Sequence, residues 1–273
     1  MDKIYSTLCN CWKGSEQMQP PVSRELEAHP DSTGDSVGDT KLLRTASVTE
    51  ECGANFNALV EIQNQQILCG DSNGRMFSVD YMKDEVLKKW DGHSKSITKA
   101  CVEADVDGPP SNMFTASRDL SIKMWKISGG FSCTQEFKGH HDLVVTAVAA
   151  HPKNRNVICS GSRDNTVALW DVSTGSVTNS VKIARNLVTD LCWKDDILAQ
   201  TSEDKSLRLW DPRSLEVTHT FIKKQQILTS CDVSSSIVAT SSSGFNGSGC
   251  EISLWDHRNT TLPYHEFKVT LRR

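Results

Sequence analysis

Two groups of side chains in this sequence have the residue types that nucleophilic catalysis uses. His93 precedes Ser117 and Asp119, and a second group contains His140 and Asp164. A histidine held between a hydroxyl and a carboxylate can activate the hydroxyl oxygen as a nucleophile. The same combination recurs along the chain, however, whereas a catalytic site would occur once. We therefore expect both groups to be structural.

The other reactive residue types are not spaced as a catalytic or metal site requires. The ten cysteines include one close pair, Cys9 and Cys11, and no two-plus-two zinc pattern. The glycine-rich segment 244–249 does not lead from a strand into a helix, so we do not expect it to cradle a phosphate. The sequence therefore predicts a protein that is not an enzyme and that needs no metal or other cofactor.

Four tryptophans recur at nearly constant spacing, each at the end of a short segment of alternating polarity. The spacings between Trp125, Trp170, Trp210 and Trp255 are 45, 40 and 45 residues. Aspartate follows three of them, and another aspartate lies six residues before three of them. A less regular unit precedes the four, with Val79 in place of the tryptophan. This pattern predicts repeated units of short strands joined by tight turns.

The period, the Gly-His pairs and the Trp-Asp pairs resemble the WD-repeat (WD40) family of β-propellers. The resemblance covers roughly residues 55–267. It implies an all-β fold in which each repeat supplies one four-stranded blade, with the outer strand of a blade borrowed from the next repeat. We expect five repeats within residues 53–273. Because propellers of this family usually have seven blades, we expect a truncated or alternatively spliced form of a seven-bladed parent. A closed five-bladed ring is the alternative.

The resemblance also implies a hydrogen-bonded tetrad of histidine, hydroxyl, aspartate and tryptophan inside a blade. One set is His93, Asp119 and Trp125, with Thr115 or Ser117; the other is His140, Asp164 and Trp170, with Ser160 or Ser162. The repeat with Asp204 and Trp210 lacks the histidine, and the repeat with Trp255 lacks both the histidine and the turn aspartate. We expect these last two blades to be held together mainly by packing.

Residues 1–52 differ from the rest of the chain in charge and composition. They carry five Lys and Arg against nine Asp and Glu, so the remainder of the chain is neutral. Because residues 13 to about 50 contain no aromatic side chain, we expect residues 1–52 to be a disordered acidic tail. Arg44 and Ser47 match a basophilic kinase site, although the same segment could form an edge strand. Lipidation of Cys9 or Cys11 is an alternative to a plain disordered tail.

The part of the chain after residue 52 is neutral, and the sequence has no long apolar segment. These two features narrow the classes of partner. Nucleic-acid and anionic-membrane binding need a basic surplus, which this chain lacks. No segment has the length and apolar character of a membrane span, and we expect no secretory signal. We therefore expect a cytoplasmic protein, with nuclear, organelle-associated and cytoskeletal locations left open.

The resemblance implies a scaffold that binds protein partners on the narrower face of the propeller. The residues placed on that face are Lys95, Arg118, His141, Arg163 and Arg185, together with Phe245 and Asn246 in a longer turn. The alternative for each is an ordinary solvated surface or a tolerated loop insertion.

Two further functions are kept as alternatives. Arg213 and Arg258 each end a Trp-Asp-x-Arg motif, which resembles the motif by which some WD-repeat proteins dock onto the adaptor of cullin-type ubiquitin ligases. The chain would then be a substrate receptor. An alternative of another class is an enzyme or small-molecule binder that uses the central channel.

Overall fold

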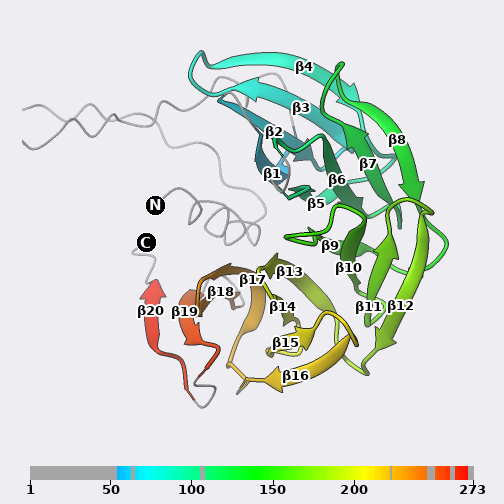
Figure 1. The fold of residues 1–273 in the computed structure, drawn as a ribbon. Coiled ribbons are helices and arrows are strands. Elements are labelled where there is room, and N and C mark those ends of the chain that lie inside the picture. The colour runs from blue at the N-terminus through cyan, green and yellow to red at the C-terminus, as the bar shows by residue number, and fades with distance from the viewer. Residues whose placement is uncertain are drawn as a thin grey trace, which may run out of the picture.

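The computed structural model describes residues 54–62, 65–104, 108–221, 223–244, 250–258 and 262–269. These residues form five four-stranded antiparallel sheets, each made of consecutive strands (Figure 1). The all-β fold expected from the repeats is therefore confirmed, with five blades. Within the described ranges, no helix is long and apolar enough to cross a membrane. The predicted tail, residues 1–52, lies outside the described residues.

The strands follow one another in the same order in every blade. Blade one comprises β1 (Phe56–Ile62), β2 (Gln66–Asp71), β3 (Arg75–Asp80) and β4 (Glu85–Asp91). Blade two comprises β5 (Ile97–Val102), β6 (Asn112–Ser117), β7 (Ile122–Lys126) and β8 (Ser132–Phe137). Blade three comprises β9 (Val145–Ala150), β10 (Val157–Ser162), β11 (Thr166–Asp171) and β12 (Ser176–Lys182). Blade four comprises β13 (Val188–Lys194), β14 (Ile197–Ser202), β15 (Leu207–Asp211) and β16 (Glu216–Thr220). Blade five comprises β17 (Ile227–Ser234), β18 (Ile237–Ser243), β19 (Cys250–Asp256) and β20 (His265–Val269).

Burial within a blade explains the composition of its strands. In the second strand, such as β10, almost every residue is buried because neighbouring blades cover both faces of the sheet. The fourth strand, such as β12, alternates between exposed and half-buried residues because it lies at the rim. The periodic sequence therefore places apolar residues in the second and third strands and polar residues in the fourth.

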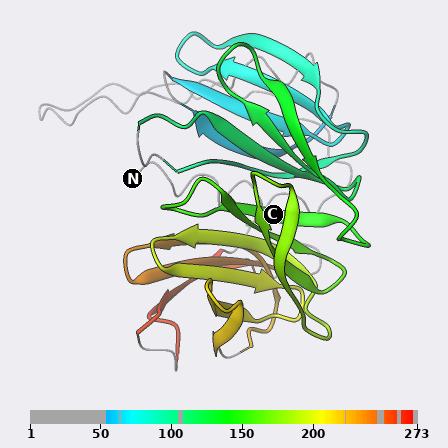
Figure 2. The same ribbon diagram turned by 45° about the vertical axis from the view of Figure 1, so that its right-hand side comes forward.

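The hydrophobic cores lie between blades. One cluster joins Cys159 and Leu169 of blade three to Leu191 and Trp210 of blade four, and similar clusters join the other neighbouring pairs. Gly161 shows how closely two blades approach, because a Cβ atom there would lie 2.4 Å from Cγ1 of Val188. Figure 2 shows the sheets of successive blades lying face to face. No blade can bury its apolar faces alone.

Hydrogen bonds along the inner strands also tie one blade to the next. The Thr98 hydroxyl of blade two donates to the Val145 carbonyl of blade three at 2.6 Å, and the Thr146 hydroxyl donates to the Val188 carbonyl of blade four at 2.7 Å. The five blades form an arc with blades one and five at its ends (Figure 1). The expectation of two further blades stays a prediction.

Candidate functional site

The predicted tetrad of blade two is assembled around Thr115. His93 in the loop before β5 places Nδ1 2.9 Å from Asp119 Oδ2 and Nε2 2.8 Å from the Thr115 hydroxyl. Trp125 on β7 donates its indole N–H to the same hydroxyl at 2.8 Å. Ser117, the other candidate hydroxyl, instead bonds to the Lys95 and Ser96 carbonyls.

In blade three the tetrad histidine is His141, and the expectation for His140 is wrong. His141 Nδ1 lies 3.1 Å from Asp164 Oδ2, and Nε2 lies 2.7 Å from the Ser160 hydroxyl, which also accepts the Trp170 indole N–H at 2.7 Å. The His140 ring packs edge-on against Trp170 instead. Because the His141 side chain is only 1% exposed, its expected place on the partner-binding surface is also wrong.

The position of the inner strand identifies the tetrad histidine better than the Gly-His pair does. His93 lies four residues before β5 begins at Ile97, and His141 lies four residues before β9 begins at Val145. Gly139 is followed by two histidines, so counting from the glycine selects the wrong one. The strand fixes how far the loop reaches into the blade, and therefore which side chain meets the turn aspartate.

Donors and acceptors in both tetrads are mutually satisfied. The tryptophan N–H donates to the hydroxyl, the hydroxyl donates to histidine Nε2, and Nδ1–H donates to the aspartate. Burial alone would raise the carboxyl pKa values, but hydrogen bonds from His93 and Ser121 hold the pKa of Asp119 well below its usual range. Those from His141 and Thr166 do the same to the pKa of Asp164. Because their polar atoms are buried and occupied, these groups serve the fold.

Blade four contains a different polar network, which corrects the expectation that mainly packing holds it. Trp210 donates to Gln200 Oε1 at 3.1 Å, and Gln200 donates to Asn186 Oδ1 at 2.7 Å. Arg208 donates to the same Asn186 oxygen at 2.9 Å and forms an ion pair with Asp204. Gln200 and Asn186 thus replace the hydroxyl and the histidine. The signal that could have identified this network is the arginine four residues after the turn aspartate.

Blade one uses the same arginine spacing, whereas blade five has only part of a network. Arg75 Nε lies 2.7 Å from Asp71 Oδ2, and Asp71 is fully buried. In blade five, Trp255 donates its N–H to the Thr240 hydroxyl at 2.9 Å. The Phe221 ring packs against Trp255 with centroids 5.1 Å apart. The expectation that packing contributes strongly therefore fits blade five better than blade four.

The first candidate site is the end of the central channel where the inner strands begin, here called the channel mouth. It contains a cavity of about 350 Å³, and its walls include Arg118, Arg163, Glu203 and Ile227. The structure thus brings together residues that the sequence placed on one face. Arg163 is paired with Glu203, whereas Arg118 is exposed and has no ion pair within the described residues. Lys95 and Arg185 are also exposed on loops at this end of the propeller.

An ion pair in the channel was not foreseen from the sequence. Lys99 Nζ on β5 lies 2.7 Å from Asp190 Oδ1 on β13, and both line the channel-mouth cavity. Burial opposes the charge on Lys99, but Asp190 raises the pKa of that ammonium group above its ordinary value. The Ser230 hydroxyl of blade five also donates to Asp190. The pair therefore links blades two, four and five across the channel.

Comparison with known proteins agrees with the blade geometry. The WD40 family (WD domain, G-beta repeat) matches residues 84–126 and 131–171. Each matched segment begins at the outer strand of one blade and continues through three strands of the next, as the resemblance implied. Residues 84–126 and 131–171 of the chain are therefore WD40 repeats.

Curated relatives of this chain match over part of their length. Nuclear distribution protein PAC1 of Arthroderma otae is 32% identical over 146 residues, which cover 47% of this chain and 32% of the relative. Coronin-like protein crn1 of Schizosaccharomyces pombe is 28% identical over 165 residues, covering 55% of this chain and 27% of the relative. The chain therefore spans about a third or less of these relatives. The structure titled "Structure of U3-55K" superimposes with a TM-score of 0.70 at 15% identity, covering 83% of this chain and 66% of that one.

The arginines of the two Trp-Asp-x-Arg motifs form ion pairs with the aspartates of the same motifs. Arg213 Nη2 lies 3.0 Å from Asp211 Oδ2, and Arg258 Nη2 lies 2.7 Å from Asp256 Oδ2. These hydrogen bonds hold the pKa of both carboxyls below the usual range, that of Asp256 at about 2. Both arginine side chains remain largely exposed, at 89% and 68%. Each arginine therefore closes a turn, and adaptor docking stays a prediction.

Several predicted sites lie outside the described residues. They are Phe245 and Asn246 in the longer turn, Ser47 as a phosphorylation site, and Cys9 and Cys11 as lipidation sites.

Proposed function

We propose that this chain is a non-enzymatic scaffold that binds an acidic surface of a partner protein at the channel mouth. WD-repeat propellers are generally non-enzymatic scaffolds. The single observation that supports the choice of face is Arg118, an exposed guanidinium at the cavity with no ion pair within the described residues. A partner carboxylate can accept two hydrogen bonds from such a group.

The charges around the mouth favour an anionic partner. Arg163 is neutralised by Glu203, and Lys99 is neutralised by Asp190. Exposed Lys95 and Arg185 then add to the charge of Arg118. Complementary charges of this kind raise the rate of encounter and fix the register of a partner, more than they add raw affinity.

Quantitative affinity purification with a charge-reversed variant tests this proposal. Arg118→Glu should remove a defined set of partners that the wild-type chain recovers, and it should leave the melting temperature unchanged. Lys126→Glu is the matched control, because Lys126 is exposed at the opposite end of β7 from the Arg118 turn. Equal recovery of all partners by the wild type and both variants would refute binding at the mouth.

A second candidate is docking of a cullin-type ligase adaptor through Arg213 and Arg258. The observation that favours it is the exposure of both arginines at corresponding turns of blades four and five. Docking would exchange each intramolecular carboxylate for one on the adaptor. The double variant Arg213→Ala and Arg258→Ala should lose the adaptor from co-purification while folding normally. Adaptor recovery that is absent from the wild type, or unchanged by both substitutions, would rule this function out.

A further inference from the structure

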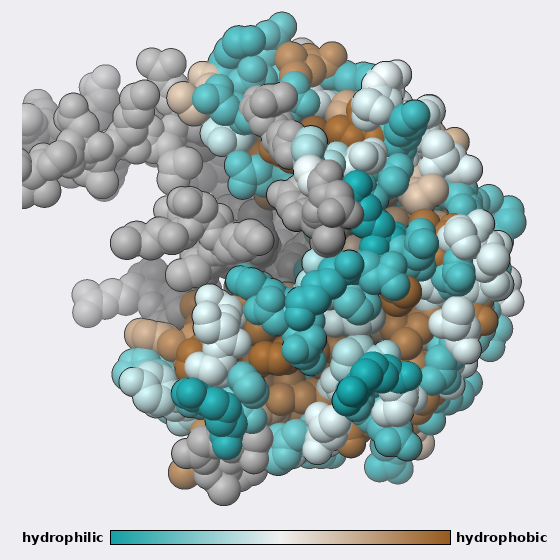
Figure 3. All heavy atoms as spheres, viewed as in Figure 1, coloured by the Kyte–Doolittle hydropathy of each residue, from teal (hydrophilic) through white to brown (hydrophobic). Residues whose placement is uncertain are grey.

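A second pocket lies at the opposite end of the propeller from the channel mouth. Its volume is about 820 Å³, and most of its walls come from blade four, including the turns β13–β14 and β15–β16. The strands are antiparallel, so these turns lie at the other end of the blade from the β14–β15 turn, which contributes Glu203 to the mouth. Figure 3 shows brown apolar atoms exposed over blades four and five on the face turned to the viewer.

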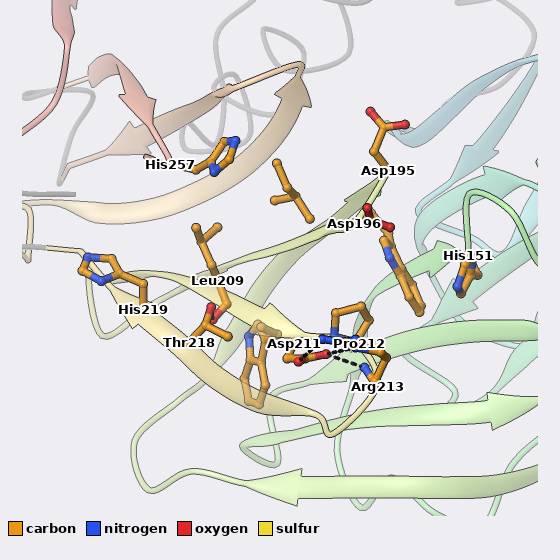
Figure 4. Close-up of a pocket in the computed structure, with 13 residues that line it drawn as sticks. His151, Asp195, Asp196, Leu209, Asp211, Pro212, Arg213, Thr218, His219 and His257 are labelled. Atoms are coloured by element: carbon orange, nitrogen blue, oxygen red, sulfur yellow. Dashed lines mark hydrogen bonds and ion pairs between the residues drawn. The ribbon is translucent and has the colours of Figure 1, made fainter. Parts of the chain in front are cut away.

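One part of the wall of this pocket is apolar and aromatic, and the rest is polar. The apolar part includes Trp193, Ile197, Leu209, Trp210 and Pro212. Figure 4 shows His151 on one side of the pocket, with His219 and His257 on the other. Burial, with repulsion from Lys153, lowers the pKa of His151, so this imidazole adds no positive charge at neutral pH. Such a surface suits a long side chain whose stem is aliphatic.

The charge still free in the pocket is negative. Asp195 is exposed and has no ion pair within the described residues, and the one ion pair of Asp196 there is exposed, with 3.3 Å between Asp196 Oδ1 and Lys153 Nζ. Arg213 is already bound to Asp211 by three hydrogen bonds. In Figure 4 the Asp195 and Asp196 side chains lie on the side of the pocket away from the Asp211–Arg213 pair. A cation that enters the pocket therefore meets two available carboxylates.

A buried donor without an acceptor points to the same pocket. Trp193 is 8% exposed, and its indole N–H has no hydrogen-bond partner. The four tryptophans that end third strands all donate to an oxygen atom. An unsatisfied buried donor is unfavourable, so a ligand that offers an acceptor to this N–H would bind more tightly. The atom is covered, so a ligand must first displace a neighbour such as His151, whose ring centroid lies 4.6 Å from that of Trp193.

We propose that this pocket binds an arginine side chain on an extended segment of a partner protein. The guanidinium group pairs with Asp195 and Asp196, and its flat face lies against the aromatic wall. The aliphatic stem covers Leu209 and Ile197. A backbone carbonyl of the segment accepts the Trp193 N–H. Arginine fits better than lysine because its planar group can bind carboxylates in a fixed geometry and stack on rings. The site is independent of binding at the channel mouth.

Peptide display against the full chain tests the proposal. A library of random nine-residue peptides is selected on the wild type and depleted on the double variant Asp195→Asn and Asp196→Asn. Asn is suited to position 195, where the backbone φ is 51°. The surviving peptides should share arginine at one position. No shared arginine, or peptides that bind the double variant equally well, would overturn the proposal.

Fluorescence anisotropy with a selected peptide then separates charge from shape. Replacing its arginine by lysine should weaken binding about threefold or more, and glutamine should abolish it. The double variant should weaken binding at least tenfold, whereas Asp84→Asn with Glu85→Gln should not. That pair is a matched control, because Asp84 also has a positive φ, 58°, and lies in the β3–β4 turn of blade one, at the same end of the propeller as the β13–β14 turn. An equal loss in the control would overturn the assignment.

Trp193→Phe tests the buried donor. The substitution keeps an aromatic ring and removes the N–H, so it should leave the melting temperature unchanged or raise it. It should also weaken the affinity for the selected peptide several-fold. Peptide binding that is unaffected by this substitution would refute the proposed carbonyl contact.

Discussion

Blades two and three pair the turn aspartate with a histidine, whereas blades one and four pair it with an arginine. The histidines come from the preceding loop, so His93 and Asp119 are 26 residues apart. The arginines come from the third strand, four residues after the aspartate, as in Arg75 and Arg208. The comparison shows that the fold requires a satisfied carboxylate at the turn more strictly than it requires a particular partner.

The two solutions differ in what they connect. A histidine tetrad links the loop, the turn and the third-strand tryptophan in one chain of hydrogen bonds. An arginine pair links only the turn and the third strand, since both residues belong to one hairpin. Blade four restores the connection to the loop through Asn186, which accepts hydrogen bonds from Arg208 and Gln200. Blade four therefore combines a fixed charge with the connectivity of a tetrad.

The largest expected effect is the loss of the blade-four arginine. Arg208→Met keeps much of the side-chain volume but removes the partner of Asp204, whose side chain is 10% exposed, and a donor to Asn186, so it should lower the free energy of unfolding by about 3 kcal/mol. Arg75→Met should cost about 1 kcal/mol, because the Arg75 side chain is more exposed, 22% against 9%, and Asp71 keeps two backbone donors whereas Asp204 keeps one. Urea denaturation measures both. Equal losses would show that the two pairs are equivalent.

Removing the turn aspartate of blade three should have the next largest effect. Asp164→Ala leaves the donors of His141, Asp142 and Thr166 without their acceptor, and we expect a loss of about 2 kcal/mol. Glu85→Ala, an exposed carboxylate, should cost less than about 0.5 kcal/mol. If thermal unfolding gave the two variants the same melting temperature, the tetrad would contribute nothing specific to stability.

The features predicted correctly from the sequence are those that repeat. The tryptophans keep a blade period, and short strands recur between turn residues at the same interval, so the blades follow from local pattern. Val79 was recognised as a tryptophan position by its spacing alone, and it lies buried on β3. The acidic turn residues follow for the same reason.

The features missed depend on contacts that no period encodes. Asn186 and Gln200 satisfy the same requirement with other residue types, so a search for histidine and a hydroxyl passes over them. The Lys99–Asp190 pair joins blades two and four, whose relative placement is fixed only once blade three lies between them. The large pocket at the other end likewise gathers residues from three blades.

A pair of histidine variants would sharpen the assignment within blade three. His141→Ala removes the partner of both Asp164 and Ser160 and should cost about 2 kcal/mol. His140→Ala removes a ring contact with Trp170 and should cost about 0.5 kcal/mol. Chemical denaturation of the two variants gives the difference directly. A larger loss for His140 would contradict the geometry of the tetrad.

The smallest effect appears only in acid, where the tetrad carboxyls become protonated. Although burial opposes ionisation, hydrogen bonds from His141 and Thr166 place the pKa of Asp164 below its unfolded value. A carboxyl with a depressed native pKa stabilises the fold fully above the unfolded pKa, near 4, and loses that contribution as the pH falls towards the native pKa. Asp164→Asn cannot titrate. The fall in unfolding free energy between about pH 4 and 2.5 should therefore be shallower in this variant, by about 1 kcal/mol per pH unit.

The control for this acid effect is Asp196→Asn, whose carboxyl is 93% exposed. Its curve of stability against pH should follow that of the wild type, since an exposed carboxyl gains little from the fold. Denaturant titrations at several pH values, read by tryptophan fluorescence, measure all three proteins. If Asp164→Asn and the wild type lost stability at the same rate in acid, the hydrogen bonds around Asp164 would not favour its charged form. The distinction between histidine and arginine blades would then rest on connectivity alone.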